Sequence, residues 1–346
     1  MSQDDALNLL LNLLRNEVDP CLWIADEHVA GLQQIPVNPV AEVISNRFDV
    51  AESLKAAGWN SQFSDLDFSH INEQSLSAVY FRLAKEKPLV NHVINQATRI
   101  LKPGGRLIIS GDKQQGIKTY TKNAGQCLNG EVKIKKHGKN YLASISRGQL
   151  TNEPLDDKNY VKLRNVLQYQ TLDIYSKPGQ FGWDKLDKGS LLLAQQFAML
   201  QLNSPSTILD LGCGYGLLSS AAHQHWPNAK ISATDNNAAA LISCQHNFKQ
   251  QAITGEVIAA NCAASIHKQH ELILCNPPFH QGFAVENDLT EQFIATAKRL
   301  CQPNGSALFV VNAFIPLERI AKKYFTQQQL LVNDGHFKVF RFGFSD

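Results

Sequence analysis

The chain has 346 residues and a formal net charge of +2, and this length suggests two domains, each large enough for its own core. Its seven cysteines include no CxxC pair, and their odd number argues against a disulfide framework as well as a zinc knuckle. Acids near the N-terminus exclude an ordinary signal peptide, and no run approaches the ~20 apolar residues of a membrane span, so we expect a reduced cytoplasmic protein without a membrane role.

The first half of the chain alternates short apolar runs with helical patterns. After an amphipathic first helix, strands are expected at residues 21–25, 41–44, 78–80 and 106–110, with a helix over about 90–101. This alternation is typical of a mostly parallel sheet with helices on its faces. A single glycine, Gly31, follows the first strand at a distance, so no glycine-rich loop is available there. We therefore expect residues 1–150 to form a sheet domain that lacks a cofactor loop.

A basic stretch lies between Lys102 and Arg147. It contains ten lysines and arginines, whereas its acids are Asp112 and Glu131 alone. Such a local excess of positive charge is typical of contact with a polyanion, although a solvated surface would have the same composition.

Polar residues cluster over residues 151–177, and we interpret this segment as a linker between domains. The following residues, 178–190, are rich in glycine, aromatic and charged side chains and lead into a helix over about 190–200. Residues 178–346 are then expected to form the second domain.

The second domain opens with an apolar strand at residues 207–211 that runs into Gly212, Gly214 and Gly216. Glycines at a strand-to-helix turn let a ligand approach the backbone beside the helix N-terminus. The next strand, 230–234, ends at Asp235, a carboxylate that could accept both hydroxyl groups of a ribose. A third strand, 256–260, ends at Asn261, a candidate for hydrogen bonds to an adenine edge.

The fourth strand, 272–275, ends in the tetrapeptide Asn-Pro-Pro-Phe at residues 276–279. Its two prolines fix the backbone and remove N–H donors, so the carbonyl groups of Asn276 and Pro277 are presented as acceptors. The Asn276 side chain adds another acceptor, and Phe279 offers a flat face for stacking. The loop therefore has the features of a receptor for a planar amine. Further strands are expected at residues 307–311 and 337–341.

Ligand residues at the carboxyl ends of successive parallel strands converge on one crevice. With its glycine motif at residues 210–216, the chain resembles the class I S-adenosylmethionine-dependent methyltransferases. It is most similar to the bacterial small-subunit ribosomal RNA guanine-N2 methyltransferases of the RsmC kind, through residues 178–190, 276–280, 312–314 and 335–339. That resemblance covers essentially the whole chain and implies two tandem Rossmann-like α/β methyltransferase domains, the N-terminal one degenerate and used for RNA docking.

The resemblance also implies the roles of individual residues. The S-adenosylmethionine site would contain Asp210, Gly212, Gly214, Asp235, Asn261 and Asn276. The catalytic set would be Asn276, Pro277 and Phe279, and the base would contact Phe181, Phe279 and His280. Direct transfer from a sulfonium requires no metal, because alignment and electrostatics carry the catalysis.

The expected function is therefore methylation of the exocyclic N2 amine of a guanine in 16S ribosomal RNA, by a monomer that acts on the small subunit. Methylation of 23S ribosomal RNA stays open, since only the resemblance separates the two subunits. A protein-glutamine methyltransferase would normally have Tyr in place of Phe279 and would not require the basic stretch. A non-catalytic RNA-binding assembly protein would be expected to lose the glycine loop in both halves, and only the first half lacks it.

Overall fold

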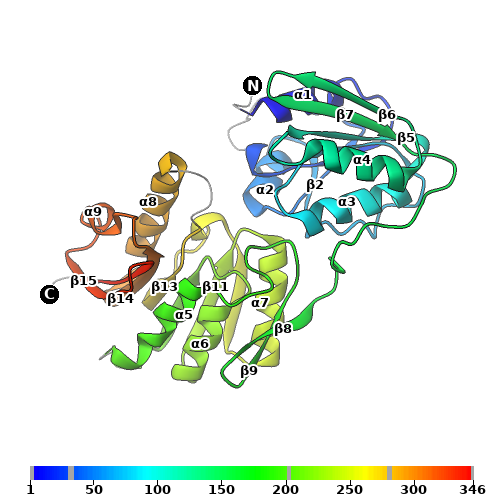
Figure 1. Ribbon diagram of the computed structural model, residues 1–346. Coiled ribbons are helices and arrows are strands. Elements are labelled where there is room, and N and C mark those ends of the chain that lie inside the picture. Colours follow the sequence, from blue (N-terminus) through cyan, green and yellow to red (C-terminus); the bar gives the residue numbers. More distant parts are fainter. Residues whose placement is uncertain (1–3, 30–34, 201–203, 279–282, 344–346) are drawn as a thin grey trace. The chain divides into compact units, whose positions relative to one another are not determined.

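A computed structural model describes residues 4–29, 35–200, 204–278 and 283–343, with side chains from residue 289 onward in the last segment. The chain divides into two compact units, Met1–Lys162 and Leu163–Asp346 (Figure 1). Each unit contains a seven-stranded sheet, and β8 and β9 form a separate two-stranded sheet in the second unit. Within the described part of the chain, no helix is long and apolar enough to cross a membrane.

The sheet of the first unit has the order β3-β2-β1-β4-β5-β7-β6. Strands β1 to β5 are parallel, whereas β7 runs antiparallel to both β5 and β6. Its strands are β1 Cys21–Ile24, β2 Ala41–Ser45, β3 Asn60–Phe63, β4 Leu76–Arg82, β5 Leu101–Asp112, β6 Val132–His137 and β7 Asn140–Ser146. Its helices are α1 Asp5–Leu14, α2 Phe48–Ala56, α3 Lys87–Ile100 and α4 Ile117–Leu128, with a short 3-10 turn at Glu27–Val29.

Both faces of this sheet are covered. Side chains of α1 and α2 form one apolar cluster with Trp23 and Val43, and those of α3 and α4 form another with Leu22 and Ile44. Neighbouring residues of β1 and β2 thus point to opposite cores, which explains why these strands are mostly apolar instead of alternating.

The sheet of the second unit has the order β12-β11-β10-β13-β14-β16-β15, with only β15 and β16 antiparallel to their neighbours. Its strands are β10 Thr207–Leu211, β11 Lys230–Asp235, β12 Gly255–Ala259, β13 His270–Cys275, β14 Cys301–Asn312, β15 Gln327–Asn333 and β16 Phe337–Gly343. Its helices are α5 Lys188–Gln195, α6 Leu217–His225, α7 Ala238–Gln250, α8 Phe283–Leu300 and α9 Leu317–Ala321, with 3-10 turns at Phe197–Met199 and Asn261–Ala263. The hairpin strands are β8 Arg164–Tyr169 and β9 Leu172–Ser176.

Helices α5, α6 and α7 pack on one face of the second sheet, and α8 and α9 pack on the other, as their separate apolar clusters show (Figure 1). When the strands of each seven-stranded sheet are numbered from 1 in chain order, both sheets have the strand order 3-2-1-4-5-7-6. The expectation of two tandem Rossmann-like α/β domains is therefore confirmed, and the sequence that follows β1 contains the single glycine Gly31 in place of a glycine-rich loop.

Several strands escaped the sequence analysis because they are polar or solvent-exposed. Strand β6 is exposed along nearly its whole length, and β8 and β9 lie within the segment expected to be a linker, residues 151–177. The chain passes from the first unit to the second between Lys162 and Leu163. Tyr160 belongs to the core of the first unit, whereas Ile174 of the hairpin packs on the second.

Candidate active site

The central strand β10 brings two ligand loops together. In the parallel register, Leu211 lies beside Thr234 of β11 on one side and Cys275 of β13 on the other. The residues that directly follow these three in the chain are Gly212, Asp235 and Asn276, so these positions lie together at one edge of the sheet. The chain passes from β12 back across to β13, which makes this edge the point where the strand order reverses and where open α/β sheets bind ligands.

The glycine loop adopts a backbone that only glycine takes readily. Gly212, Gly214 and Gly216 have φ values of +80°, +53° and +87°. A Cβ on Gly216 would lie 2.9 Å from the Cys244 sulfur, whereas a Cβ on Gly214 would meet no heavy atom within 4 Å. Gly216 is thus required for packing, and Gly214 faces open space in which a ligand could approach the backbone.

Asp235 holds this loop in place. Its Oδ2 accepts a hydrogen bond from the Gly214 N–H at 2.9 Å, and its Oδ1 accepts from the N–H groups of Asn236 and Asn237 at 2.7 and 2.9 Å. Two carboxylate oxygens offer about four acceptor positions, so these bonds leave room for a further donor. Because the Ala260 N–H donates to the Asp235 carbonyl, the loop containing Asn261 is held beside Asp235, with the Asn261 side chain exposed.

Asp210 lies beneath the loop instead of lining it. Its side chain is 0% exposed, and its Oδ2 accepts hydrogen bonds from the Ser219 N–H and hydroxyl group at 2.9 and 2.6 Å. Burial raises the pKa of Asp210 to about 7, although the bonds from Ser219 oppose the increase. In this structure Asp210 anchors the start of α6 below the glycine turn.

Neutralising Asp210 should remove a pH dependence of stability. An aspartate in the unfolded chain titrates near 3.8, so between about pH 4 and pH 7 the folded chain binds more protons than the unfolded chain. The free energy of unfolding should therefore fall as the pH rises through this interval, and Asp210→Asn should flatten that part of the profile. Denaturant unfolding at a series of pH values from about 4 to 8 measures this free energy. Asp173→Asn, at an exposed aspartate, is the control. If the slope of the free energy against pH is the same in Asp210→Asn as in the wild type, the raised pKa of Asp210 is contradicted.

Asn276 is fixed by the helix on the other side of the crevice. Its Nδ2 donates to Asp187 Oδ1 at 2.7 Å and to Ser190 Oγ at 2.9 Å. Asp187 is the N-cap of α5, and its Oδ1 also accepts from the Ser190 N–H at 2.7 Å. Pro277 is buried and Pro278 exposed, while Phe279 and His280 lie outside the described residues.

The segment before α5 is attached to the same edge. The Gly179 carbonyl accepts from Asn237 Nδ2 at 2.9 Å, and the buried Gln180 donates to Ser243 Oγ at 2.6 Å. Between these anchors and α5, Phe181 is 62% exposed, with the Lys185 ammonium 5.5 Å from its ring centroid. An exposed aromatic ring beside the Asp235 loop is available for stacking.

In the first unit, an ion-pair cluster lies where the second unit has its crevice. Arg82, at the end of β4, is buried and donates to Asp4 through Nε and Nη2 at 3.0 and 2.7 Å and to Asp26 at 3.3 Å. Asp26 follows β1 and is the counterpart of the glycine loop, and it also contacts His28. Burial is the largest single influence on the pKa of His28 and lowers it, but the hydrogen bond to Asp26 and the negative charges of Asp26 and Glu27 together raise this pKa above its ordinary value. These charged groups occupy the switch point of the first unit.

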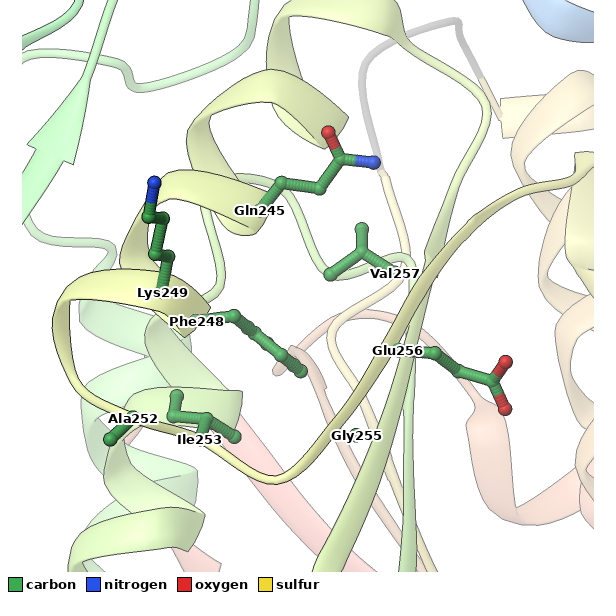
Figure 2. Close-up of a pocket in the computed structure, with 8 residues that line it drawn as sticks. All are labelled: Gln245, Phe248, Lys249, Ala252, Ile253, Gly255, Glu256 and Val257. Carbon is green, nitrogen blue, oxygen red and sulfur yellow. The ribbon is translucent and has the colours of Figure 1, made fainter.

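A cavity of about 410 Å³ lies between α7 and β12, away from these residues (Figure 2). The residues of β12 that line the cavity start at Gly255, at the amino end of the strand, whereas Asp235 and Asn261 lie at the carboxyl ends of β11 and β12. The Glu256 carboxylate in Figure 2 is turned away from the Phe248 ring. The cavity is therefore not part of the crevice.

Six residues predicted from the sequence lie along one edge of the second sheet: Asn276, Pro277, Asp235, Gly212, Gly214 and Asn261. The sequence analysis missed the roles of Asp187, Ser190 and Asn237, which contact the crevice residues from distant parts of the chain. An N-cap signal, Asp187 three residues before Ser190, was present in the sequence, but its contact with Asn276 is not local.

Comparison with known proteins agrees with this geometry. Residues 171–341 match the family model described as "Methyltransferase small domain". A ribosomal RNA small subunit methyltransferase C of Haemophilus influenzae (strain PittGG) is 29% identical over 305 residues, covering 86% of each chain. The protein of the same name from Proteus mirabilis (strain HI4320) is 28% identical over 288 residues, covering 83% of this chain and 82% of the relative.

A solved structure has the same two-unit fold. It is described as the Thermus thermophilus 16S rRNA N2 G1207 methyltransferase in complex with AdoMet and guanosine. It superposes with a TM-score of 0.83 at 21% identity, covering 99% of this chain and 92% of the other.

Proposed function

We propose that this chain is a member of the small-subunit ribosomal RNA methyltransferase C family and transfers a methyl group from S-adenosylmethionine to the N2 amine of a guanine in 16S ribosomal RNA. The observation that carries the proposal is the position of Asn276. It follows β13 directly beside the Gly212 loop, which follows β10, so an amine acceptor and a cofactor loop share one edge of the sheet.

The residues of this edge fit S-adenosylmethionine. The open side of Gly214 lets a ligand approach the backbone, and Asp235 retains acceptor capacity for a ribose hydroxyl group. Asn261, exposed on the neighbouring loop, is proposed to contact the adenine. Buried Asp210 would act on the site only by holding α6 and the glycine turn. When bound, the cofactor supplies an electrophilic methyl group on a sulfonium sulfur.

The chain's own contribution to transfer is to hold and polarise the amine. The lone pair of an exocyclic base amine is delocalised into the ring, which makes the nitrogen a poor nucleophile. Two acceptors that hold its hydrogens out of the ring plane would return that lone pair to the nitrogen and orient it. We assign these roles to Asn276 Oδ1 and the Pro277 carbonyl, which would also stabilise the positive charge that develops on the amine nitrogen until the extra proton is lost to solvent.

A base in folded RNA must leave its stack to reach this loop. The exposed ring of Phe181 is proposed to stack on it or to close the pocket, together with Phe279 and His280. We further propose that the target corresponds to G1207, the nucleotide named for the Thermus thermophilus enzyme.

The test transfers labelled methyl groups to small ribosomal subunits and digests the RNA to nucleosides. Label in N2-methylguanosine is expected, and fragment mass spectrometry should place it at the position corresponding to G1207. Label in N6-methyladenosine or N4-methylcytidine, or equal activity on free oligonucleotides, would refute the proposal.

We propose that the first unit docks the RNA through a groove between α4 and the β6–β7 hairpin. The groove has a volume of about 920 Å³, and among the described residues that line it are three lysines and no acid: Lys118, Lys122 and Lys136. Tyr141 lies under the Lys118 ammonium, 5.4 Å from ring centroid to nitrogen. Lysines on β6 could also serve to protect an exposed edge strand from pairing, so docking requires its own test.

Replacing Lys118, Lys122 and Lys136, the three lysines that line the groove, by glutamate should weaken RNA binding to a similar extent for every RNA sequence. Each lost phosphate contact should lower the slope of log affinity against log salt by about one. A control with the same charge change at Lys55, Lys85 and Lys87, exposed elsewhere on this unit, should keep most of the affinity. Equal losses in both variants would show that only net charge matters.

One chain supplies both the crevice and the docking unit, so we propose that the protein acts as a monomer in the cytoplasm, where small subunits are assembled. Sedimentation at assay concentration tests the first statement, and fractionation of cells tests the second. A dimer required for turnover, or a membrane-bound fraction, would overturn them.

A further inference from the structure

Asn276 is useful as an acceptor only if its amide has one particular orientation. An asparagine side chain carries an oxygen and an NH₂ group on the same carbon, and a half-turn about χ2 exchanges them. With the oxygen toward the substrate, the amide accepts from the base amine. After a half-turn, two NH₂ groups would face each other and the amine would lose its acceptor.

The structure provides a group that discriminates between these orientations. An ionised carboxylate accepts hydrogen bonds and donates none, so Asp187 Oδ1, 2.7 Å from Asn276 Nδ2, is compatible with only one of them. Ser190 Oγ, 2.9 Å from the same nitrogen, could donate or accept and does not discriminate by itself. With its NH₂ group committed to α5, the amide turns its oxygen away from that helix.

Asp187 is itself held from two directions. As the N-cap of α5, its Oδ1 accepts from the Ser190 N–H at 2.7 Å. Its backbone N–H donates to the Tyr215 hydroxyl at 3.4 Å, and Tyr215, buried within the glycine motif, donates to the Lys185 carbonyl at 3.1 Å. A continuous set of hydrogen bonds thus connects the cofactor loop to the amine acceptor.

The first unit contains the same connection with a different partner. There the N-cap of α1, Asp4, accepts from the Leu7 N–H at 2.7 Å and binds Arg82 at the end of β4. Helix α1 precedes β1 as α5 precedes β10, so in both units an N-cap aspartate holds the side chain at the end of the fourth strand. In the first unit the held group closes the crevice, and in the second it is an amide.

We propose that Asp187, assisted by Ser190, is a positioning residue that fixes the Asn276 amide with its oxygen toward the substrate amine. This inference rests on the proposed function, because it assigns the reason why Asn276 is competent as an acceptor. Asp187 does not touch substrate in this scheme and acts only through Asn276.

The variant that tests it is Asp187→Gly. Glycine is tolerated at an N-cap, so α5 should lose little stability, while the acceptor for Asn276 Nδ2 is removed. We expect kcat to fall on the order of 10- to 100-fold, with the KM for subunits and the Kd for S-adenosylmethionine within about twofold of wild type. Asp187→Asn should recover most of the kcat, because its oxygen can still accept from both Ser190 N–H and Asn276. Asp184→Gly, the same change at an exposed aspartate of the same segment, should behave as wild type.

Three results would overturn the inference: an unchanged kcat in Asp187→Gly, an Asp187→Asn variant as slow as Asp187→Gly, or a loss of kcat matched by equal losses in cofactor affinity and melting temperature. The last result would indicate a structural role only. Asn276→Ala, assayed in parallel, separates this inference from the proposed function. If Asn276→Ala is inactive and Asp187→Gly is fully active, only the positioning role is wrong, whereas an active Asn276→Ala would refute the site itself.

Discussion

Replacing Asn276 by alanine should lower kcat about 10²- to 10³-fold, the range expected when one preorganised hydrogen-bonding group is removed from a transition state. The side chain is held by Asp187 and Ser190 beside the glycine loop, so its loss leaves the base amine with one acceptor instead of two. The affinity for S-adenosylmethionine should change little, because Gly214 and Asp235 are untouched. Single-turnover methyl transfer to small subunits measures the first quantity, and calorimetry measures the second.

The matched control is Asn165→Ala, in which an exposed asparagine of β8 loses the same atoms without changing the crevice. It should retain wild-type turnover. If Asn276→Ala keeps its kcat but raises the KM for subunits, Asn276 contributes uniform binding instead of transition-state stabilisation. A primary loss of cofactor affinity would assign Asn276 to the cofactor and contradict its role toward the amine.

Replacing Asp235 by alanine should weaken S-adenosylmethionine binding by about 10- to 100-fold or more. A hydrogen bond to a charged group contributes roughly 1.5–3 kcal/mol, and each 1.4 kcal/mol is about tenfold in Kd. The alanine variant also loses the acceptor of the Gly214, Asn236 and Asn237 N–H groups, so the loop would no longer be held in its binding conformation. Calorimetry measures the Kd for S-adenosylmethionine in each variant. Asp173→Ala, at an exposed aspartate, is the control and should keep the wild-type Kd.

The same titrations count the sites. One S-adenosylmethionine per chain is expected in the wild type, because Arg82 with Asp4 and Asp26 occupies the corresponding switch point of the first unit. Two sites per chain would show that this cluster opens to admit a ligand. An unchanged Kd in Asp235→Ala would place the ribose elsewhere.

Much of the architecture follows from sequence because it depends on local patterns. Apolar runs predicted β1, β2, β10 and β13, since a strand buried on both faces is mostly apolar. The glycine turn was predicted from the three glycines that follow β10, and the structure shows at each of them a positive φ that only glycine adopts readily. Asn276 was predicted from the rigid Pro-Pro context. Strand ends in a parallel sheet meet at one edge, so the crevice could be inferred from their order alone.

Strand β6 and the β8–β9 hairpin were not predicted, because β6 is exposed along nearly its whole length and the hairpin lies within a segment whose clustered polar residues indicated a linker. Their existence depends on hydrogen bonds to neighbouring strands, and β6 pairs only with β7 at the edge of its sheet.

The tertiary structure alone decided how the crevice residues are held. Asp187 and Asn276 are separated by 89 positions, and Asp4 and Arg82 by 78, so neither contact leaves a local signal in the sequence. Asp210 illustrates the same limit: its place in the glycine motif suggested a ligand contact, but only the packing of α6 over β10 revealed a carboxylate buried against Ser219. Sequence specifies which chemical groups reach the edge of the sheet, whereas the direction in which each group points is set by non-local hydrogen bonds that form only when the helices pack.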